Sequence, residues 1–502
     1  MPSRVEFPIL VAATFASGLA ALVPVVLAAT SGDLRVAKVF LASAVVLLLT
    51  GTFCAISLAN RRRELTIFDQ LVGLAATFAL APLMTAMPVY LLIDDLSLSD
   101  AYVEFVSCFT TTGGALTDIP ATEGIVHFWR AEVAWLGGLL MWGAAVAIFR
   151  PLDLGGFESV QHGGFGPAAH LSSRRKHRAR SYLNSTILKL APLYMAVTAV
   201  LWGLLLLAGF EPFPAVVVAM STVSTSGITV GDTALPASAG FWGEFWILLF
   251  MLLALSRIVA TGSVRRLGSL SFVRDPEINL AAMLIAATLA AALLFEWHEL
   301  VREYNNSGLR HVAFNCWGII FTAVSYLTTT GFGSAHWPFA TVSGQYGLPD
   351  MILMTLAMLG GGVATTAGGI KLLRIYLLFN RSRHEVHRIV MPQSSLSRGS
   401  YGKVLRTEGA SLAWIFIVLL ALSFAALFIY LSARGLEFEA AMTVTAAMLT
   451  TTGPLVGETL GSDFDLQDLD MVSRLILAFA MIVGRLELLV FVFIAGRLEW
   501  LK

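Results

Sequence analysis

Residues 110–113 read Thr110-Thr111-Thr112-Gly113, and this hydroxyl-rich run ending in glycine decides how the chain is organised. The run returns three times, as Ser224-Thr225-Ser226-Gly227, Thr328-Thr329-Thr330-Gly331 and Thr450-Thr451-Thr452-Gly453. The glycines follow one another at similar intervals (227 − 113 = 114, 331 − 227 = 104 and 453 − 331 = 122). Each run follows an apolar span and a short amphipathic segment, and it precedes another apolar span. The chain therefore contains four copies of one unit, made of a helix, a half-helix, a loop and a second helix.

The composition is that of a membrane protein. Of the 502 residues, 57% are hydrophobic and 13% are charged, and the mean hydropathy is +0.77. Soluble domains average roughly 45–50% apolar and about 25% charged residues. Cys54, Cys108 and Cys316 lie far apart in or near apolar runs, so we expect them to form neither a disulfide nor a zinc site. We expect no cleaved signal peptide, because residues 1–8 are only lightly basic and lack a small-residue cleavage site.

Ten segments are apolar enough to be spanning helices, which need about 20 residues each. They are 7–30, 36–58, 68–93, 128–149, 185–210, 241–261, 278–295, 351–378, 411–431 and 472–493. The first two precede the first copy of the unit and form an extra hairpin. We therefore predict an all-α polytopic membrane protein with an N-terminal hairpin (1–66) and four pseudo-symmetric pore repeats (67–165, 166–274, 275–400 and 401–502) around a central pore.

The distribution of charge predicts the orientation. Basic residues gather in alternate loops, at 61–63, 174–180, 265–274 and 381–406, whereas the other loops are acidic or neutral. Basic loops face the cytoplasm, so both termini do as well. Arg35 and Lys38, in the first outer loop, run against this rule. The basic loops could set orientation alone or also dock a partner. Membrane lipid is an expected partner, and nucleic acid is not.

The four loops have the composition of a cation filter. Irregular backbone at membrane depth is tolerated only where it lines a cavity or is buried in protein. Selectivity filters use rings of backbone carbonyls in place of an ion's hydration shell. Glycine lets a loop turn its carbonyls inward by adopting a positive φ, and threonine hydroxyls can brace the loop or add ligands. The candidate ion-binding residues are Thr111, Thr112, Gly113, Thr225, Ser226, Gly227, Thr329, Thr330, Gly331, Thr451, Thr452 and Gly453.

Ordinary helix packing also uses small and hydroxyl residues, but that explanation fits one run better than four matching ones. We predict half-helices at 98–109, 214–222, 310–327 and 438–449. Each would aim its C-terminal end, which carries partial negative charge, at a filter loop. Glu104, in the first half-helix, is either a brace for cation binding or a structural carboxylate. Asp118 and Asp232 could enrich cations at the mouth or belong to ordinary solvated loops.

A glycine-rich break interrupts the span at 351–378. Each glycine costs about 1 kcal/mol relative to alanine in a helix, so the break should line the path at membrane depth and could block it. The candidate gate residues are Gly360, Gly361, Gly362, Thr365, Thr366, Gly368, Gly369, Lys371 and Arg485. Arg485 is a charge within the last span, where it could face the pore and pair with Glu487, or be an interfacial anchor. A packing kink is the alternative for the break, and Lys371 and Arg374 could be cytoplasmic anchors.

Enzymatic function is not expected. We find no nucleophile–base pair and no phosphate-binding loop, and the nine histidines do not cluster, so we expect no organic cofactor on this chain. Two transport classes remain, a gated cation pathway and a sodium- or proton-coupled symporter, which would carry titratable residues at membrane depth. Glu104 and Glu487 are the only notable carboxylates that we identify in the spans, which favours a channel-like pathway. A scaffold without transport would leave the four glycine-ended loops unexplained.

The chain resembles the Trk/Ktr/HKT superfamily over nearly its whole length, and its bacterial TrkH branch most of all. The residues that carry the resemblance are 105–113, 128–130 and 135–138, Leu309-Arg310-His311 with 328–332, and 367–374. The extra N-terminal hairpin is similar to TrkH rather than to KtrB.

The resemblance implies potassium uptake across a bacterial inner membrane, with the potassium ion held at Gly113, Gly227, Gly331 and Gly453. It also implies that residues 360–369 form a gating loop and that Arg485 lies below the filter. Family members are typically homodimers that bind a cytosolic ring of nucleotide-binding RCK subunits such as TrkA. Glycine rather than serine at the first filter position leans toward potassium. The chain departs from the family pattern in the fourth filter, Thr452-Gly453-Pro454-Leu455, at Ser226, and at Trp142 and Ala144.

Overall fold

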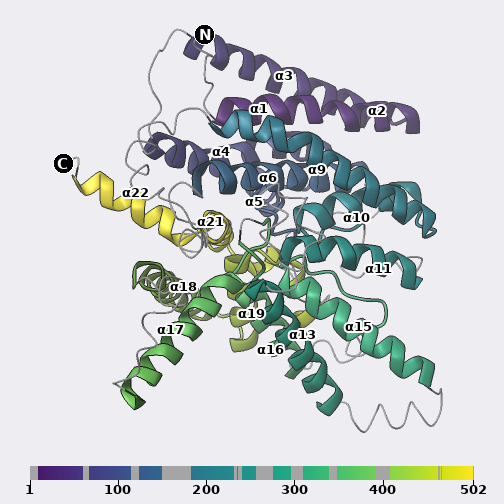
Figure 1. Cartoon of the computed structure of the whole chain (residues 1–502). Coiled ribbons are helices and arrows are strands. Elements are labelled where there is room, and N and C mark those ends of the chain that lie inside the picture. Colours follow the sequence, from purple (N-terminus) through teal and green to yellow (C-terminus); the bar gives the residue numbers. More distant parts are fainter. Residues whose placement is uncertain are drawn as a thin grey trace.

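The fold is helical, as the sequence predicts. The computed structural model describes residues 9–59, 67–114, 124–149, 182–230, 235, 240–255, 275–295, 309–337, 348–363, 365–391, 407–461, 464 and 466–500. Within these ranges the regular elements are all helices, and no β-strand is present. Figure 1 shows two short helices, α5 (Leu98–Phe109) and α19 (Phe438–Thr450), near the middle of the molecule, with longer helices around them.

An extra hairpin stands at the N-terminal end. The first predicted span is formed by α1 (Ile9–Ala20) and α2 (Leu22–Ser31), which are separated by a turn at Ala21. Gly32 ends α2 with a φ of 83°, a left-handed conformation that suits glycine at a helix C-terminus. The chain then returns as α3 (Leu34–Ala59), which lies beside α1 at the edge of the molecule (Figure 1).

Four units of similar order follow the hairpin. They comprise α4 (Ile67–Leu92), α5 and α6 (Gly124–Ala144) with η1 (Ala145–Phe149); α9 (Tyr182–Leu207), α10 (Pro212–Ser224) and α11 (Gly240–Met251) with η5 (Leu252–Leu255); α13 (Pro276–Phe295), α15 (Leu309–Leu327) and α16 (Leu348–Leu359); and α18 (Thr407–Ala433), α19 and α21 (Met471–Leu486). The remaining elements are α17 (Leu372–Val390), α20 (Pro454–Leu460), η8 (Leu466–Asp468) and α22 (Leu488–Trp500). The half-helices α5, α10, α15 and α19 lie at nearly the predicted positions. The exact repeat boundaries remain predictions.

The described residues contain seven helical segments that are long and apolar enough to cross a membrane, or eight if α21 and α22 count as one bent span. The prediction of one uninterrupted last span is wrong, because the chain turns by 95° between α21 and α22. Glu487 makes this turn with a φ of 66°. The span predicted at 351–378 is divided into α16 and α17, as its glycine content indicates. The span predicted at 241–261 is described only as far as Leu255.

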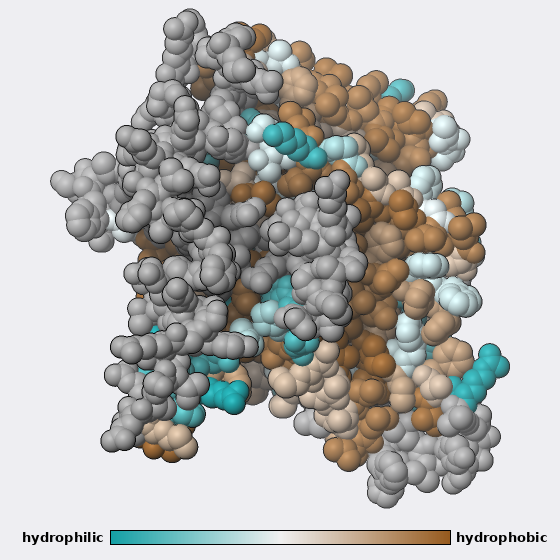
Figure 2. All heavy atoms as spheres, viewed as in Figure 1, coloured by the Kyte–Doolittle hydropathy of each residue, from teal (hydrophilic) through white to brown (hydrophobic). Residues whose placement is uncertain are grey.

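The outward-facing side chains suit lipid. Val26, Val46 and Phe53 of the hairpin and Leu294 of α13 are largely exposed. Figure 2 shows hydrophobic side chains spread over a broad area of one face. Water-soluble monomers rarely expose contiguous apolar patches larger than a few hundred Å². The chain is therefore a multi-pass membrane protein.

Candidate functional site

The four hydroxyl–glycine loops share one backbone geometry. Each begins where a half-helix ends, and its second residue adopts the left-handed conformation. The φ angles are 56° at Thr111, 57° at Thr225, 56° at Thr329 and 55° at Thr451. This conformation is uncommon for any residue other than glycine and is costly for a β-branched one. Its presence at the same place in four loops indicates a required turn.

Hydrogen bonds hold each turn in the same way. In each loop the backbone amide of the third residue donates to a carbonyl of the preceding half-helix. These bonds run from Thr112 to Ser107 (2.8 Å), from Ser226 to Ser221 (3.0 Å), from Thr330 to Ser325 (2.9 Å) and from Thr452 to Ala447 (2.9 Å). Paired hydroxyls brace each loop as well, between Thr110 and Thr112 (2.8 Å), Ser224 and Ser226 (3.1 Å), Thr328 and Thr330 (2.9 Å), and Thr450 and Thr452 (3.2 Å). Bracing, one of the two roles that the sequence left open for the hydroxyls, is thus present in all four loops.

The glycines behave alike in three loops and differently in the fourth. Gly113, Gly227 and Gly331 have φ angles of 75°, 68° and 84°, as predicted for glycines that turn carbonyls inward. Gly453 has a φ of −59°, so the expectation of a positive φ is wrong there. The reason is local, because Pro454 follows at once and begins α20, whose N-cap is Gly453.

The four loops meet closely. A Cβ atom at Gly113 would overlap the carbonyl oxygen of Ser226, and one at Gly227 would overlap that of Thr330. The amide of Gly453 donates to the carbonyl of Thr112 at 2.7 Å. All twelve candidate ion-binding residues are buried. Tertiary structure thus brings together four loops that lie more than a hundred residues apart in the sequence.

Small residues behind the loops permit this approach. A Cβ atom at Gly137 of α6 would overlap the carbonyl of Phe109, the last residue of α5. A Cβ atom at Gly484 of α21 would likewise overlap the carbonyl of Leu449, near the end of α19. Two half-helices therefore rest against glycines in the helices that follow them. A single glycine inside an apolar span is the sequence signal for such packing.

The predicted break forms a compact loop. The chain leaves α16 at Gly360 (φ 72°) and returns through Gly369 (φ 73°) and Lys371 (φ 79°). The amide of Lys371 donates to the carbonyl of Leu359 at 3.1 Å, so the loop closes on its own start. The gate candidates Gly360, Gly361, Gly362, Thr365, Thr366, Gly368 and Lys371 are buried, and Gly369 is half-buried.

Neighbouring helices clamp this loop at its two sides. Glu277, a fully buried residue of α13, accepts from the Val363 amide at 2.9 Å. Arg485 of α21 donates from Nη1 to the Thr366 carbonyl at 2.5 Å and is 2% exposed. Arg485 Nε and Nη2 have no hydrogen-bond partner among the described residues. Arg485 is therefore a buried cation beside the loop rather than an interfacial anchor.

Glu487 pairs with Arg374, not with Arg485. The carboxylate lies 2.7 Å from Arg374 Nη2, and both side chains are almost entirely buried. The Arg374 guanidinium also lies over the Phe416 ring, 4.0 Å from its centroid. Lys371 and Arg374 are buried, so the reading of them as cytoplasmic anchors is wrong. Lys371 Nζ instead donates to the Ala367 carbonyl within the loop.

Buried carboxylates also support the hydroxyl–glycine loops. Glu104 of α5 forms a buried ion pair with Arg130 of α6 at 2.5 Å. Glu244 of α11 accepts from Trp317 Nε1 on α15 (2.7 Å). It also accepts from the Ser334 hydroxyl and the Ala335 amide (both 2.9 Å), just after the third hydroxyl–glycine loop. We did not single out Glu132, Glu244 and Glu277 from the sequence, although a carboxylate at membrane depth is a recognisable signal.

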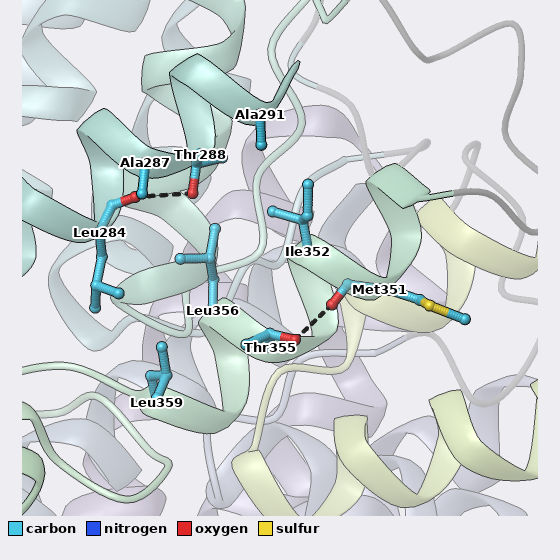
Figure 3. Close-up of a pocket in the computed structure, with 9 residues that line it drawn as sticks. All are labelled: Leu284, Ala287, Thr288, Ala291, Met351, Ile352, Thr355, Leu356 and Leu359. Carbon is cyan, nitrogen blue, oxygen red and sulfur yellow. Dashed lines mark hydrogen bonds between the residues drawn. The ribbon is translucent and has the colours of Figure 1, made fainter. Parts of the chain in front are cut away.

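A cavity of about 270 Å³ lies between α13 and α16, close to the loop. Figure 3 shows its apolar lining, which includes Leu284, Leu356 and Leu359. The hydroxyls of Thr288 and Thr355 bond to carbonyls of their own helices, those of Leu284 and Met351 (Figure 3). This cavity therefore presents little that would attract a cation, unlike the four loops. Asp118 and Asp232 lie outside the described residues.

The arrangement suits a dehydrated cation, because four loops rich in carbonyl and hydroxyl oxygens converge at the ends of four half-helices.

A family model described as TrkH, cation transport protein, matches residues 37–498. The Trk system potassium uptake protein TrkH of Halomonas elongata is 29% identical over 470 residues, or 90% of each chain. The TrkH of Vibrio parahaemolyticus is 25% identical over 92% of each chain. The crystal structure of the potassium transporter TrkH from Vibrio parahaemolyticus matches over 98% of both chains with a TM-score of 0.78 at 22% identity, which indicates a shared fold.

Proposed function

Since the chain belongs to the TrkH family of cation transport proteins, we propose that it carries potassium ions across the bacterial inner membrane through a pore formed by the four loops. The observation that carries this proposal is the fourfold repetition of one turn, with a left-handed threonine at Thr111, Thr225, Thr329 and Thr451. Curated relatives that match most of the chain are potassium uptake proteins, which supports potassium as the cation.

The filter works by replacing water with protein oxygens. Carbonyls of the loops and the C-terminal ends of α5, α10, α15 and α19 supply the negative potential that favours a cation. The glycines Gly113, Gly227, Gly331 and Gly453 let the loops approach one another, so their backbones rather than their side chains surround the ion. Residues 111–113, 225–227, 329–331 and 451–453 are the ion-binding residues of this proposal.

The intramembrane loop is the gate of the same pathway. The residues that form it are Gly360, Gly361, Gly362, Thr365, Thr366, Gly368, Gly369 and Lys371. Arg485 holds it through the Thr366 carbonyl. Support comes from the contact of Gly368 with the third and fourth filters, which puts the loop directly against the filter. Opening requires the loop to leave this position.

Orientation and partners follow from the charge pattern and the family. Arg381 and Arg383 of α17 belong to the basic side, which is the cytoplasmic one. Arg35, Asp94, Arg434 and Asp470 belong to the outer side, and both termini are cytoplasmic. The chain works as a homodimer surrounded by membrane lipid, and a cytosolic RCK-type subunit similar to TrkA, which carries the nucleotide, docks on the basic side.

A cation-coupled symporter of the same fold is the second candidate, and Glu132 is the observation that favours it. Glu132 lies in α6 and is 8% exposed, and its Oε2 has no hydrogen-bond partner among the described residues. Such a carboxylate could take up a proton during transport. Potassium uptake that is driven by an imposed proton gradient, and lost in Glu132→Gln, would establish this mechanism over passive flow.

The main experiment compares potassium and sodium flux in proteoliposomes that contain the purified chain. We expect potassium flux well above sodium flux, and a loss of this preference in Gly113→Ser, where the new Cβ would overlap the Ser226 carbonyl. Gly203→Ser is the matched control, because a Cβ at Gly203 would contact nothing within 4 Å. Equal potassium and sodium flux, unchanged by Gly113→Ser, would refute the filter.

A further inference from the structure

The four left-handed threonines share a backbone conformation but differ in what their hydroxyls do. The Thr225 hydroxyl donates to the carbonyl of the adjacent Ser224 at 2.7 Å. The hydroxyls of Thr111 and Thr451 have no hydrogen-bond partner among the described residues. The Thr329 hydroxyl accepts a hydrogen bond of 2.7 Å from the amide of Gly368, which belongs to the intramembrane loop. One filter threonine is thus engaged by the loop.

This bond lies in a buried, closely packed contact. Thr329 is 1% exposed, and Gly368 is buried as well. A Cβ atom at Gly368 would overlap the carbonyl of Thr450 and approach the Thr451 hydroxyl. The loop therefore sits with its bare backbone against the third and fourth filter loops. A buried amide is costly to leave without a partner, so this position of the loop depends on the acceptor that Thr329 supplies.

We propose that Thr329 holds the intramembrane loop in its closed position, so that the third filter loop and the gate form one two-state element. The clamps at Glu277 and Arg485 join the loop to α13 and α21. The bond to Thr329 joins the loop to the filter itself. Opening the gate must break this bond and release the hydroxyl, and a change at Thr329 shifts the balance between closed and open loop. Thr329 acts here as a positioning residue, and the inference rests on the proposed potassium pathway.

The loss of one such hydrogen bond is expected to raise the open population by roughly 3- to 10-fold. Thr329→Val keeps the shape of the side chain and removes the hydroxyl. Thr329→Ser keeps the hydroxyl. Thr322→Val is the matched control, because it makes the same change at a buried threonine of α15, the half-helix before the third filter, where the hydroxyl has no partner among the described residues.

The experiment measures potassium flux, and the potassium-to-sodium flux ratio, in proteoliposomes that contain the purified full chain. We expect Thr329→Val to raise potassium flux several-fold with the flux ratio unchanged, Thr329→Ser to raise it less because the hydroxyl remains, and Thr322→Val to remain near the native flux. Damage to the fold alone would lower flux instead of raising it. If valine at position 329 prevents folding, Thr329→Ala and Thr329→Ser provide the same comparison of absent and present hydroxyl.

Two outcomes overturn the inference. One is an unchanged or reduced flux in both hydroxyl-free variants. The other is an equal rise in Thr322→Val, which would assign the effect to the loss of any buried threonine hydroxyl in α15 rather than to the bond between Thr329 and Gly368. Failure of the proposed function has a different signature, since the native chain would then show no preference for potassium.

Discussion

The amide of Gly453 donates a hydrogen bond of 2.7 Å to the carbonyl oxygen of Thr112, and this bond joins the fourth filter loop to the first. The two residues are far apart in sequence and belong to the two ends of the cycle of repeats. Pro454 lies beside Gly453 and packs against Gly227 and Gly331. The fourth loop, which departs from the positive φ of the others, therefore contacts all three of its counterparts.

This contact predicts that Gly453→Ala disrupts transport. The new methyl group would overlap the Gly114 amide and the Thr112 carbonyl, both of them backbone atoms that cannot turn away. We expect at least a tenfold loss of potassium flux in proteoliposomes or a clear fall in the potassium-to-sodium ratio. Gly203→Ala, in α9, is the control, because its methyl group would contact nothing within 4 Å and alanine favours a helix by roughly 0.5–1 kcal/mol. Native flux and selectivity in Gly453→Ala would contradict this packing.

We expect Glu244 to affect ion selectivity indirectly, through its hydrogen bonds to the residues that follow the third loop. In Glu244→Gln, the amide NH₂ replaces an acceptor oxygen and faces the N–H of Trp317 or of Ala335. Each lost bond to a charged acceptor costs roughly 1.5–3 kcal/mol, so we expect the loop after the third filter to loosen and the potassium-to-sodium flux ratio to fall.

The control for Glu244 is Glu211→Gln, which makes the same change at an exposed residue of the same repeat that forms no side-chain cap bond. Glu211→Gln should retain the native ratio. An equal ratio in both variants would mean that the Glu244 network supports the fold but not the filter.

Because Arg374 and Glu487 form a buried ion pair, we expect the losses of stability caused by changing each residue not to add up in the double variant. Removing one partner leaves the other buried charge without its opposite charge and typically costs about 3–5 kcal/mol. We expect Arg374→Met and Glu487→Gln each to lower the melting temperature in detergent markedly, and the double variant to recover part of the loss. Losses in the double variant that equal the sum of the single ones would argue against a direct pair.

The exposed ion pair of Arg434 and Asp470 is expected to make the stability of the protein depend on pH in acidic solution. Hydrogen bonds from Arg434 (2.5 Å) and Ser473 (2.5 Å) lower the pKa of Asp470 from 3.8 to about 2. A lowered pKa in the folded protein means that the stabilisation is complete above 3.8 and is lost as the pH falls toward about 2. Because the pair is exposed, we expect its effect to be small.

Melting curves at neutral pH and at about pH 3 test whether Asp470 causes this dependence of stability on pH. The native chain should lose more stability between the two conditions than Asp470→Asn, which lacks the titrating group. The same loss in both would show that other carboxylates account for it.

The sequence by itself determined the class, the order of elements and the position of the four loops. Apolar spans and half-helices are local patterns, because the period of a helix and the breaking effect of glycine act on neighbouring residues. The runs at 110–113, 224–227, 328–331 and 450–453 were therefore recognisable as four matching loops, and the break at 360–369 as a fifth loop, before any contact was known.

Only the tertiary structure decided how these pieces touch. The pairing of Arg374 with Glu487, the clamp from Glu277 to Val363 and the bond from Gly368 to Thr329 each join residues separated by scores of positions. The partner of each residue depends on which helices pack side by side, and the pattern of neighbouring residues in the sequence does not determine this. The φ of Gly453 and the bend at Glu487 are likewise set by what surrounds them. Local residue types determine where the chain can turn, because glycine and proline act on their immediate neighbours, and tertiary packing decides which contacts each turn makes.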